Sequence, residues 1–119
     1  MATIKSYTDI EQSKILAEIL PIKSADMCYV IDYAESNKYG TDHFKLEVDT
    51  YGLEAQKRDN IPCWSLTALL DILPNENMLV KTTDGEYYCL AKDIMTKHYD
   101  NPIDACVATI EHLHKLKIL

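Results

Sequence analysis

Glycine, proline and long apolar runs are all scarce in this chain, which has three glycines and four prolines in 119 residues. This composition argues against a disordered or low-complexity chain. No apolar run approaches the ~20 residues that a membrane-spanning helix needs. The first seven residues also lack the apolar core of a signal sequence. We therefore expect a cytoplasmic protein with no membrane association.

The four cysteines include no CxxC pair, which argues against a zinc knuckle or a thioredoxin-type redox site. Cys28, Cys89 and Cys106 lie inside apolar stretches, where cysteine usually acts as a small buried hydrophobic residue. We predict free thiols, although the even number also allows a disulfide. His112 and His114 lie two apart on an expected helix, so they point in different directions and cannot chelate one ion. No metal and no cofactor is predicted.

Basic residues are outnumbered, with 12 Lys and Arg against 19 Asp and Glu, and the net charge is −7. The longest basic cluster is the pair Lys57-Arg58. Nucleic-acid-binding proteins normally carry a basic patch, so direct binding to nucleic acid or to anionic lipid is disfavoured. An acidic balance of this size mostly favours solubility. The acidic charge is also compatible with binding to a basic partner protein, or with a role as an acidic decoy that mimics DNA.

The length of the chain fits one domain over residues 1–119. Apolar residues make up 47% and charged residues 26%, as in an ordinary globular protein with one core. No internal repeat is present.

Local patterns predict an α+β fold with the order α-β-β-α-β-β-α. Helices are expected at 8–21, where Thr8 and Glu11 form a capping box, at 65–74 after the cap Ser65, and from Asn101 onward. Strands are expected at 27–33, 44–48, 78–83 and 86–91, and the segments 34–43 and 52–60 are expected to be connections. Residues 92–100 fit either a strand extension or irregular chain. We expect one four-stranded, mainly antiparallel sheet packed with about three helices.

The dipeptide Asp84-Gly85 between two β-rich runs predicts a hairpin with a two-residue turn. This turn places Lys81 opposite Tyr88 and Leu79 opposite Leu90. One face of the hairpin then carries Met78, Val80, Cys89 and Ala91, and the other carries Leu79, Lys81, Tyr88 and Leu90.

The expected core follows from the apolar positions of the capped helices and alternating strands. It consists of Leu16, Leu20, Phe44, Leu46, Val48, Leu69, Leu70, Val80, Val107 and Ile110.

Three segments carry a resemblance: IPCWSLTALLDILP at 61–74, YDNPIDAC at 99–106 and YTDIEQ at 7–12. Together they resemble a family of small uncharacterised proteins of gut bacteria and their phages and mobile elements. The similarity spans most of the chain and is weakest across 34–60. The resemblance implies a fold unit and a mobile-element origin, and it supplies no activity and no catalytic residue.

Cys63 is the best candidate for a nucleophile, because it lies just before an expected helix N-terminus that favours a thiolate. His98 and Asp100 are candidates for the base and its orienting group. The bland alternative is that Cys63 and Trp64 only pack at the helix entry. The Cys-Trp pair lacks the surrounding signature of papain-type enzymes.

The preferred hypothesis is a non-enzymatic interaction module that acts through a sheet face, either by self-association or by binding a protein partner. Its expected interface is Leu79, Lys81, Tyr88 and Leu90, since leucine and tyrosine on an open face beside charged residues have the composition of an interface. The chain is also rich in tyrosine, with eight residues. The alternatives are a small cysteine-dependent hydrolase using Cys63 and the acidic DNA mimic.

Overall fold

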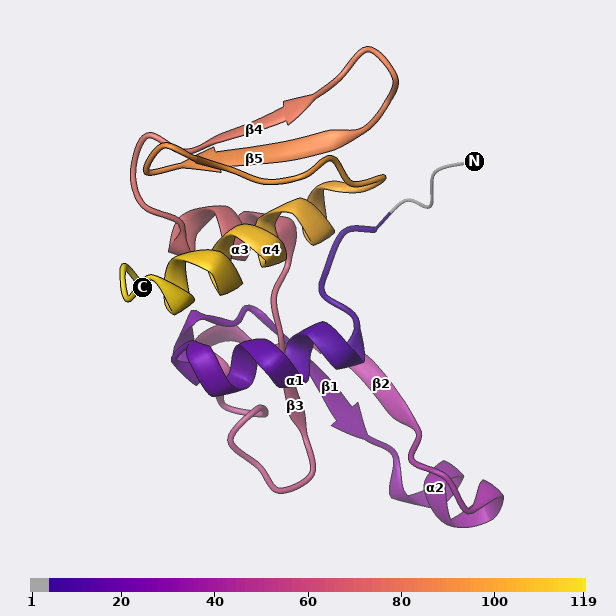
Figure 1. Ribbon diagram of the computed structural model, residues 1–119. Helices are drawn as coiled ribbons and strands as arrows, with labels where there is room; N and C mark the ends of the chain where they lie inside the picture. Colours follow the sequence, from indigo (N-terminus) through magenta and orange to yellow (C-terminus); the bar gives the residue numbers. More distant parts are fainter. Residues whose placement is uncertain (1–4) are drawn as a thin grey trace. The chain divides into compact units, whose positions relative to one another are not determined.

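The computed structural model describes residues 5–119, apart from the side chain of Tyr51, and contains helices and strands in an α+β arrangement (Figure 1). By contacts, the described chain forms two compact units. We call residues 9–64 the N-terminal unit, and residues 5–8 with 65–119 the C-terminal unit. The elements are α1 (Ile10–Ile19), β1 (Met27–Ile31), α2 (Tyr33–Tyr39), β2 (Phe44–Val48), β3 (Ile61–Cys63), α3 (Leu66–Ile72), β4 (Met78–Lys81), β5 (Tyr87–Ala91), β6 (Ile94–Met95) and α4 (Pro102–Lys115), with 3-10 turns at Ile22–Ser24 and Thr50–Gly52.

The α+β class is confirmed, but the single four-stranded sheet is wrong. Within residues 5–119 there are four α-helices and two antiparallel sheets of three strands, with the orders β2-β1-β3 and β4-β5-β6. The strands β3 and β6 have three and two residues. Strands this short cannot show the alternation of apolar and polar residues that marks a half-buried strand, so the sequence did not predict them. The single domain expected from the chain length stays a prediction.

Helix α1 starts one residue later than predicted, because its N-cap is Asp9. The Asp9 carboxylate accepts from the backbone N–H of Gln12 at 2.8 Å, and the Gln12 side chain accepts from the Asp9 N–H at 3.2 Å. This is the reciprocal capping box, moved by one position from the expected pair of Thr8 and Glu11. The helix ends just before Pro21, as predicted.

Helix α2 lies in a segment that was predicted to be a connection. The Asp32 side chain caps it by accepting from the backbone N–H of Glu35, and the helix ends at Gly40 with a φ of 71°. No residue of this seven-residue helix is buried, so it has no apolar stripe. The cap residues at its two ends are the signals that mark it.

The segment after β2 is ordered by the buried side chain of Asp49. The two oxygens of this carboxylate accept from the backbone N–H groups of Glu54 and Ala55 at 2.8 and 2.9 Å. Further along, the Asn60 amide donates to the carbonyl of Glu54 and accepts from the N–H of Ile31. These bonds tie the predicted connection at 52–60 to itself and to β1.

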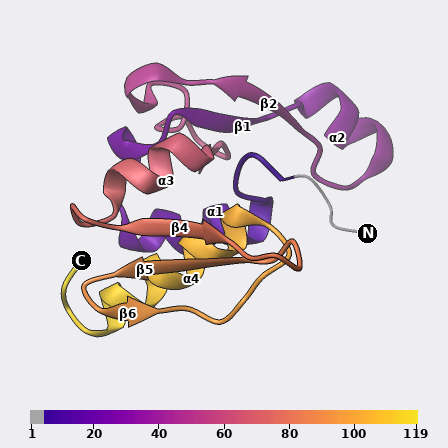
Figure 2. The same cartoon turned by 90° about the horizontal axis from the view of Figure 1, so that it is seen from above.

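In the C-terminal unit, α4 packs along one face of the sheet β4-β5-β6 and beside α3 (Figures 1 and 2). Both helices have their predicted caps, since Ser65 accepts from the N–H of Ala68 and Asn101 accepts from the N–H of Asp104. Lys5 also pairs with Asp104, with the Nζ and Oδ1 atoms 2.9 Å apart. The apolar stripe of α4 is buried as expected, with Ile103, Cys106, Val107, Ile110 and Leu113.

Burial agrees with the expected core in the helices better than in the strands. The prediction that Val48 belongs to the core is wrong, because 77% of this residue is exposed while its neighbour Asp49 is buried. The buried members are Leu16, Leu20, Leu69, Val107 and Ile110, and the half-buried members are Phe44, Leu46, Leu70 and Val80.

Candidate functional site

The hairpin between β4 and β5 turns through three residues and not two. The N–H of Gly85 donates to the carbonyl of Thr82 at 3.0 Å, and the N–H of Thr82 donates to the carbonyl of Glu86 at 2.8 Å. Gly85 has a φ of 81°, the left-handed conformation that closes a three-residue loop with a bulge. Residues 83–85 therefore form the loop, and the expected two-residue turn at Asp84-Gly85 is wrong.

The longer loop shifts the strand register by one residue. Leu79 pairs with Cys89 and Val80 pairs with Tyr88, whereas the predicted register placed Leu79 opposite Leu90. Because side chains alternate along a strand, a shift by one on one strand separates residues that were expected to share a face. Leu79 and Lys81 stand on one face and Tyr88 and Leu90 on the other, so the expected grouping of these four residues is wrong.

The inner face of this sheet meets α4 through Cys89. Its thiol is hydrogen-bonded to the thiol of Cys106 on α4 and to Thr109, and these bonds lower the pKa of Cys89 to about 7. The same bond, together with burial, raises the pKa of Cys106. All four cysteines, which also include Cys28 and Cys63, are free thiols, as predicted. Leu79, Tyr87 and Ala91 share this face by register.

The opposite face carries two rows of side chains that cross the sheet. Register places Met78, Leu90 and Met95 in one row. The second row holds Val80 opposite Tyr88, and the ring of His98 stacks on Tyr88 with centroids 5.1 Å apart and planes inclined by 15°. We call this surface the outer face; its members are Met78, Val80, Tyr88, Leu90, Met95 and His98.

The outer face is apolar and partly open. Met78 is 51% exposed and Met95 is 63% exposed, while Val80, Tyr88 and Leu90 are half-buried. Charge lies at its margin, where the Nδ1 of His98 is 3.8 Å from the Oε1 of Glu86. Methionine and aromatic residues are enriched in interface cores, where charged residues are depleted. The sequence prediction found the hairpin but placed Met78 and Val80 on the face of Cys89 and Ala91, because its register was off by one. It missed Met95 and His98 because residues 92–100 were left undecided between strand and irregular chain.

The three residues of the candidate triad lie in different units. Cys63 belongs to the N-terminal unit and is fully buried in β3, whereas reactive cysteines are usually at least partly accessible. His98 and Asp100 belong to the C-terminal unit, where His98 stacks on Tyr88 and Asp100 accepts from the side-chain amide of Asn101 at 3.0 Å. The burial of Cys63 weighs against nucleophilic catalysis, and the triad stays a prediction.

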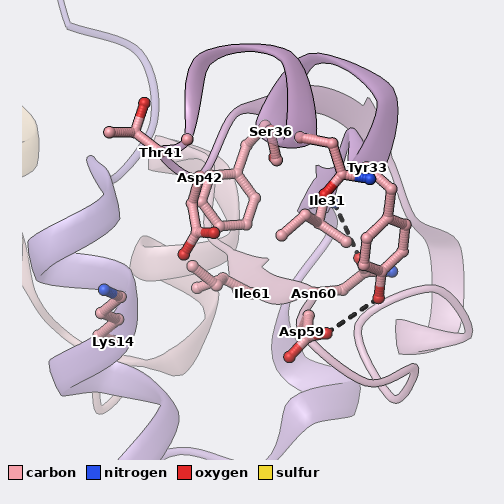
Figure 3. A pocket seen from close by; sticks show the side chains of 12 residues that line it. Lys14, Ile31, Tyr33, Ser36, Thr41, Asp42, Asp59, Asn60 and Ile61 are labelled. Carbon is pink, nitrogen blue, oxygen red and sulfur yellow. Dashed lines mark hydrogen bonds between the residues drawn. The ribbon is translucent and has the colours of Figure 1, made fainter.

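A second feature is a pocket of about 640 Å³ in the N-terminal unit (Figure 3). Its apolar floor is formed by Ile31, Phe44 and Ile61, one from each strand of the sheet β2-β1-β3, and register places all three on the same face. Polar groups surround this floor; they belong to Lys14, Tyr33, Ser36, Asn37, Thr41, Asp42, Asp59 and Asn60.

Several of these polar groups already have partners within the protein. The Tyr33 hydroxyl donates to Asp59 at 2.9 Å, and this bond raises the pKa of Tyr33. The Asn60 amide is engaged by Ile31 and Glu54. Sequence reasoning missed this pocket because most of its polar rim comes from α2 and from the segments beside it, which were expected to be connections.

Two kinds of feature are absent within residues 5–119. No group of three or more His, Cys, Asp or Glu side chains in this range is arranged to hold a metal ion. In the same range no helix has the length and apolar character needed to cross a membrane.

No protein-family model, no curated protein and no solved structure matches the chain. The resemblance to small proteins of gut bacteria and their mobile elements therefore stays a prediction.

Proposed function

We propose that the protein is a non-enzymatic module that binds another protein through the outer face of the sheet β4-β5-β6. The observation that carries this proposal is the row of Met78, Leu90 and Met95 across the sheet, whose two end residues, Met78 and Met95, are each more than half exposed. Methionine side chains are flexible and polarisable, so they adapt to a partner surface. The free thiols support the expected reducing compartment, the cytoplasm.

The partner that fits is one amphipathic helix. An interface between two folded proteins usually involves about 20–30 residues on each side, and the outer face has six. A surface of this size suits a single segment better than a second globular protein. The protein already contains the matching example, because the inner face of the same sheet is covered by one helix, α4, through an apolar stripe.

Charge narrows the choice of helix. The chain has a net charge of −7, so a helix with basic residues beside its apolar stripe is attracted, and an acidic one is repelled. Self-association through this face joins two copies of the same acidic chain. For this reason we place a basic amphipathic helix ahead of a second copy as the occupant.

The test is a selection of helical peptides from a display library on the wild-type protein alone, after which the enriched peptides are assayed for binding to the double variant Met78→Asp/Met95→Asp. Both side chains are exposed, so the variant is expected to fold. Val48→Asp is the matched control, because Val48 is an exposed apolar residue of the other sheet.

The proposal predicts enriched peptides with an apolar stripe and basic flanks that bind the wild type and the Val48→Asp control and not the double variant. Enriched peptides that bind all three proteins equally would place the binding surface elsewhere. Sedimentation velocity supplies the remaining outcome: a wild-type dimer that the double variant loses would overturn the helix as occupant in favour of a second copy.

A further inference from the structure

We propose that the pocket of the N-terminal unit binds a small zwitterion with an apolar body, of the amino-acid class. This inference does not depend on the proposed function, because it concerns a different surface in a different unit. It begins with the size of the pocket: about 640 Å³ falls within the ~300–1,000 Å³ typical of small-molecule sites.

The charge pattern of the rim selects the ligand. Lys14 on α1 and Asp42 in the loop after α2 both line the pocket, and in Figure 3 they lie on the same side of it. Neither forms an ion pair or hydrogen bond with another described residue, so both charges remain available. A lysine ammonium pairs with a carboxylate and an aspartate carboxylate with an ammonium group. A ligand that carries both groups matches this rim better than a simple anion or cation.

The floor of the pocket selects the rest of the ligand. Ile31, Phe44 and Ile61 line the pocket from three neighbouring strands and stand on the same face of the sheet. In Figure 3, Ile61 lies between Lys14 on one side and the hydrogen-bonded pair of Tyr33 and Asp59 on the other. A ligand whose charged groups meet Lys14 and Asp42 therefore places its body over apolar side chains, which favours an apolar or aromatic body.

Most of the other polar groups of the rim already have partners within the protein. The Ser36 hydroxyl accepts from the N–H of His43 at 2.9 Å, and the Thr41 hydroxyl lies 3.3 Å from the Nε2 of His43. The Tyr33 hydroxyl and the Asn60 amide are engaged in the same way. These contacts hold the rim in place while the two free charges carry recognition.

The experiment is an NMR titration of the whole chain with four probes. L-phenylalanine carries both charges, phenylalaninamide only the ammonium, N-acetylphenylalanine only the carboxylate, and N-acetylphenylalaninamide neither. We expect saturable shifts of the amides of Ile31, Phe44 and Ile61 with L-phenylalanine. Each singly charged probe should bind about tenfold more weakly, because one charge-assisted hydrogen bond is lost.

Variants assign each charge to its residue. Lys14→Gln should abolish the advantage that the carboxylate gives, and Asp42→Asn the advantage that the ammonium gives. Lys23→Gln and Glu18→Gln are the controls, because both residues are exposed charges of the same unit outside the pocket. The proposal is overturned if L-phenylalanine gives no saturable shift up to its solubility limit, if all four probes bind alike, or if the controls weaken binding as much as the pocket variants do.

Discussion

The ring of His98 stacks on the ring of Tyr88, with centroids 5.1 Å apart and planes inclined by 15°. His98 follows β6, and Tyr88 belongs to the central strand β5. Their neighbours Tyr87 and Tyr99 form an isolated antiparallel bridge, with backbone N–H···O distances of 2.6 and 2.7 Å in both directions. The ring stack and the backbone bridge together hold the chain after β6 against the central strand β5.

A double-mutant cycle measures this stack. Tyr88→Leu and His98→Ala should show a coupling of about 0.5–1.5 kcal/mol in the free energy of unfolding, as for other aromatic pairs. The control cycle pairs Tyr88→Leu with Lys92→Ala, an exposed residue of the turn after β5, and its two effects should add. Additive effects in the His98 cycle as well would show that the stack contributes nothing to stability.

The three-residue hairpin loop predicts the cost of replacing its glycine. Gly85→Ala should destabilise the fold by about 1–2 kcal/mol, because an L-residue at a positive φ is strained. Gly52→Ala should cost more, since Gly52 has the same conformation and an added Cβ would also lie 3.0 Å from the side chain of Ile22. Urea unfolding of both variants measures the two decreases in the free energy of unfolding. A larger decrease for Gly85→Ala than for Gly52→Ala would contradict this prediction.

The buried carboxylate of Asp49 should be important for the stability of the N-terminal unit. Asp49→Ala leaves the backbone N–H groups of Glu54 and Ala55 without their acceptor, and we expect a loss of about 1–3 kcal/mol in the free energy of unfolding. Glu47→Ala, an exposed acidic residue of the same strand, should change it by less than about 0.5 kcal/mol. Equal effects of the two substitutions in urea unfolding would refute the capping role.

The thiol of Cys28 predicts a loss of stability at alkaline pH. Burial, and then the charge of Asp49, raise its pKa from 9.0 to about 11 in the folded protein. Between pH 9 and pH 11 the thiol of the unfolded chain loses its proton while the thiol of the folded chain keeps it. The free energy of unfolding is therefore unaffected by this thiol below pH 9 and falls as the pH rises above 9. Above pH 11 the decrease in the free energy of unfolding approaches about 3 kcal/mol, because each unit of difference in pKa corresponds to about 1.36 kcal/mol.

Urea unfolding at a series of pH values between 9 and 11 checks this. Cys28→Ala removes the thiol, so its stability should fall less steeply with pH than that of the wild type, whatever the variant's stability at neutral pH. Parallel curves for the two proteins would show that the pKa of Cys28 is not raised on folding.

The helices with strong end signals were predictable from sequence. Ser65 and Asn101 cap α3 and α4 as expected, and the apolar stripe of α4 is buried. These features depend on residues a few positions apart, which local patterns describe well. The helix α2 was missed because it buries none of its residues, although Asp32 and Gly40 mark its ends.

The candidate site depended on a detail that local patterns leave open. Asp84-Gly85 fits a two-residue turn, and Gly85 fits equally the last position of a three-residue loop. The structure has the longer loop, and one residue of difference moved Leu79 to the helix side of the sheet while Leu90 stayed on the outer face. The pocket also could not be predicted, because its floor requires the pairing of three strands, one of which has three residues.

The most direct test of the outer face as the binding surface is an NMR titration of the protein with the tightest helix from the display selection. We expect the largest amide shifts on residues of β4, β5 and β6 that belong to the outer face, with Met78, Leu90 and Met95 among them, and we expect Met78→Asp/Met95→Asp to abolish these shifts. Shifts confined to the pocket of the N-terminal unit, or unchanged shifts in the double variant, would contradict it.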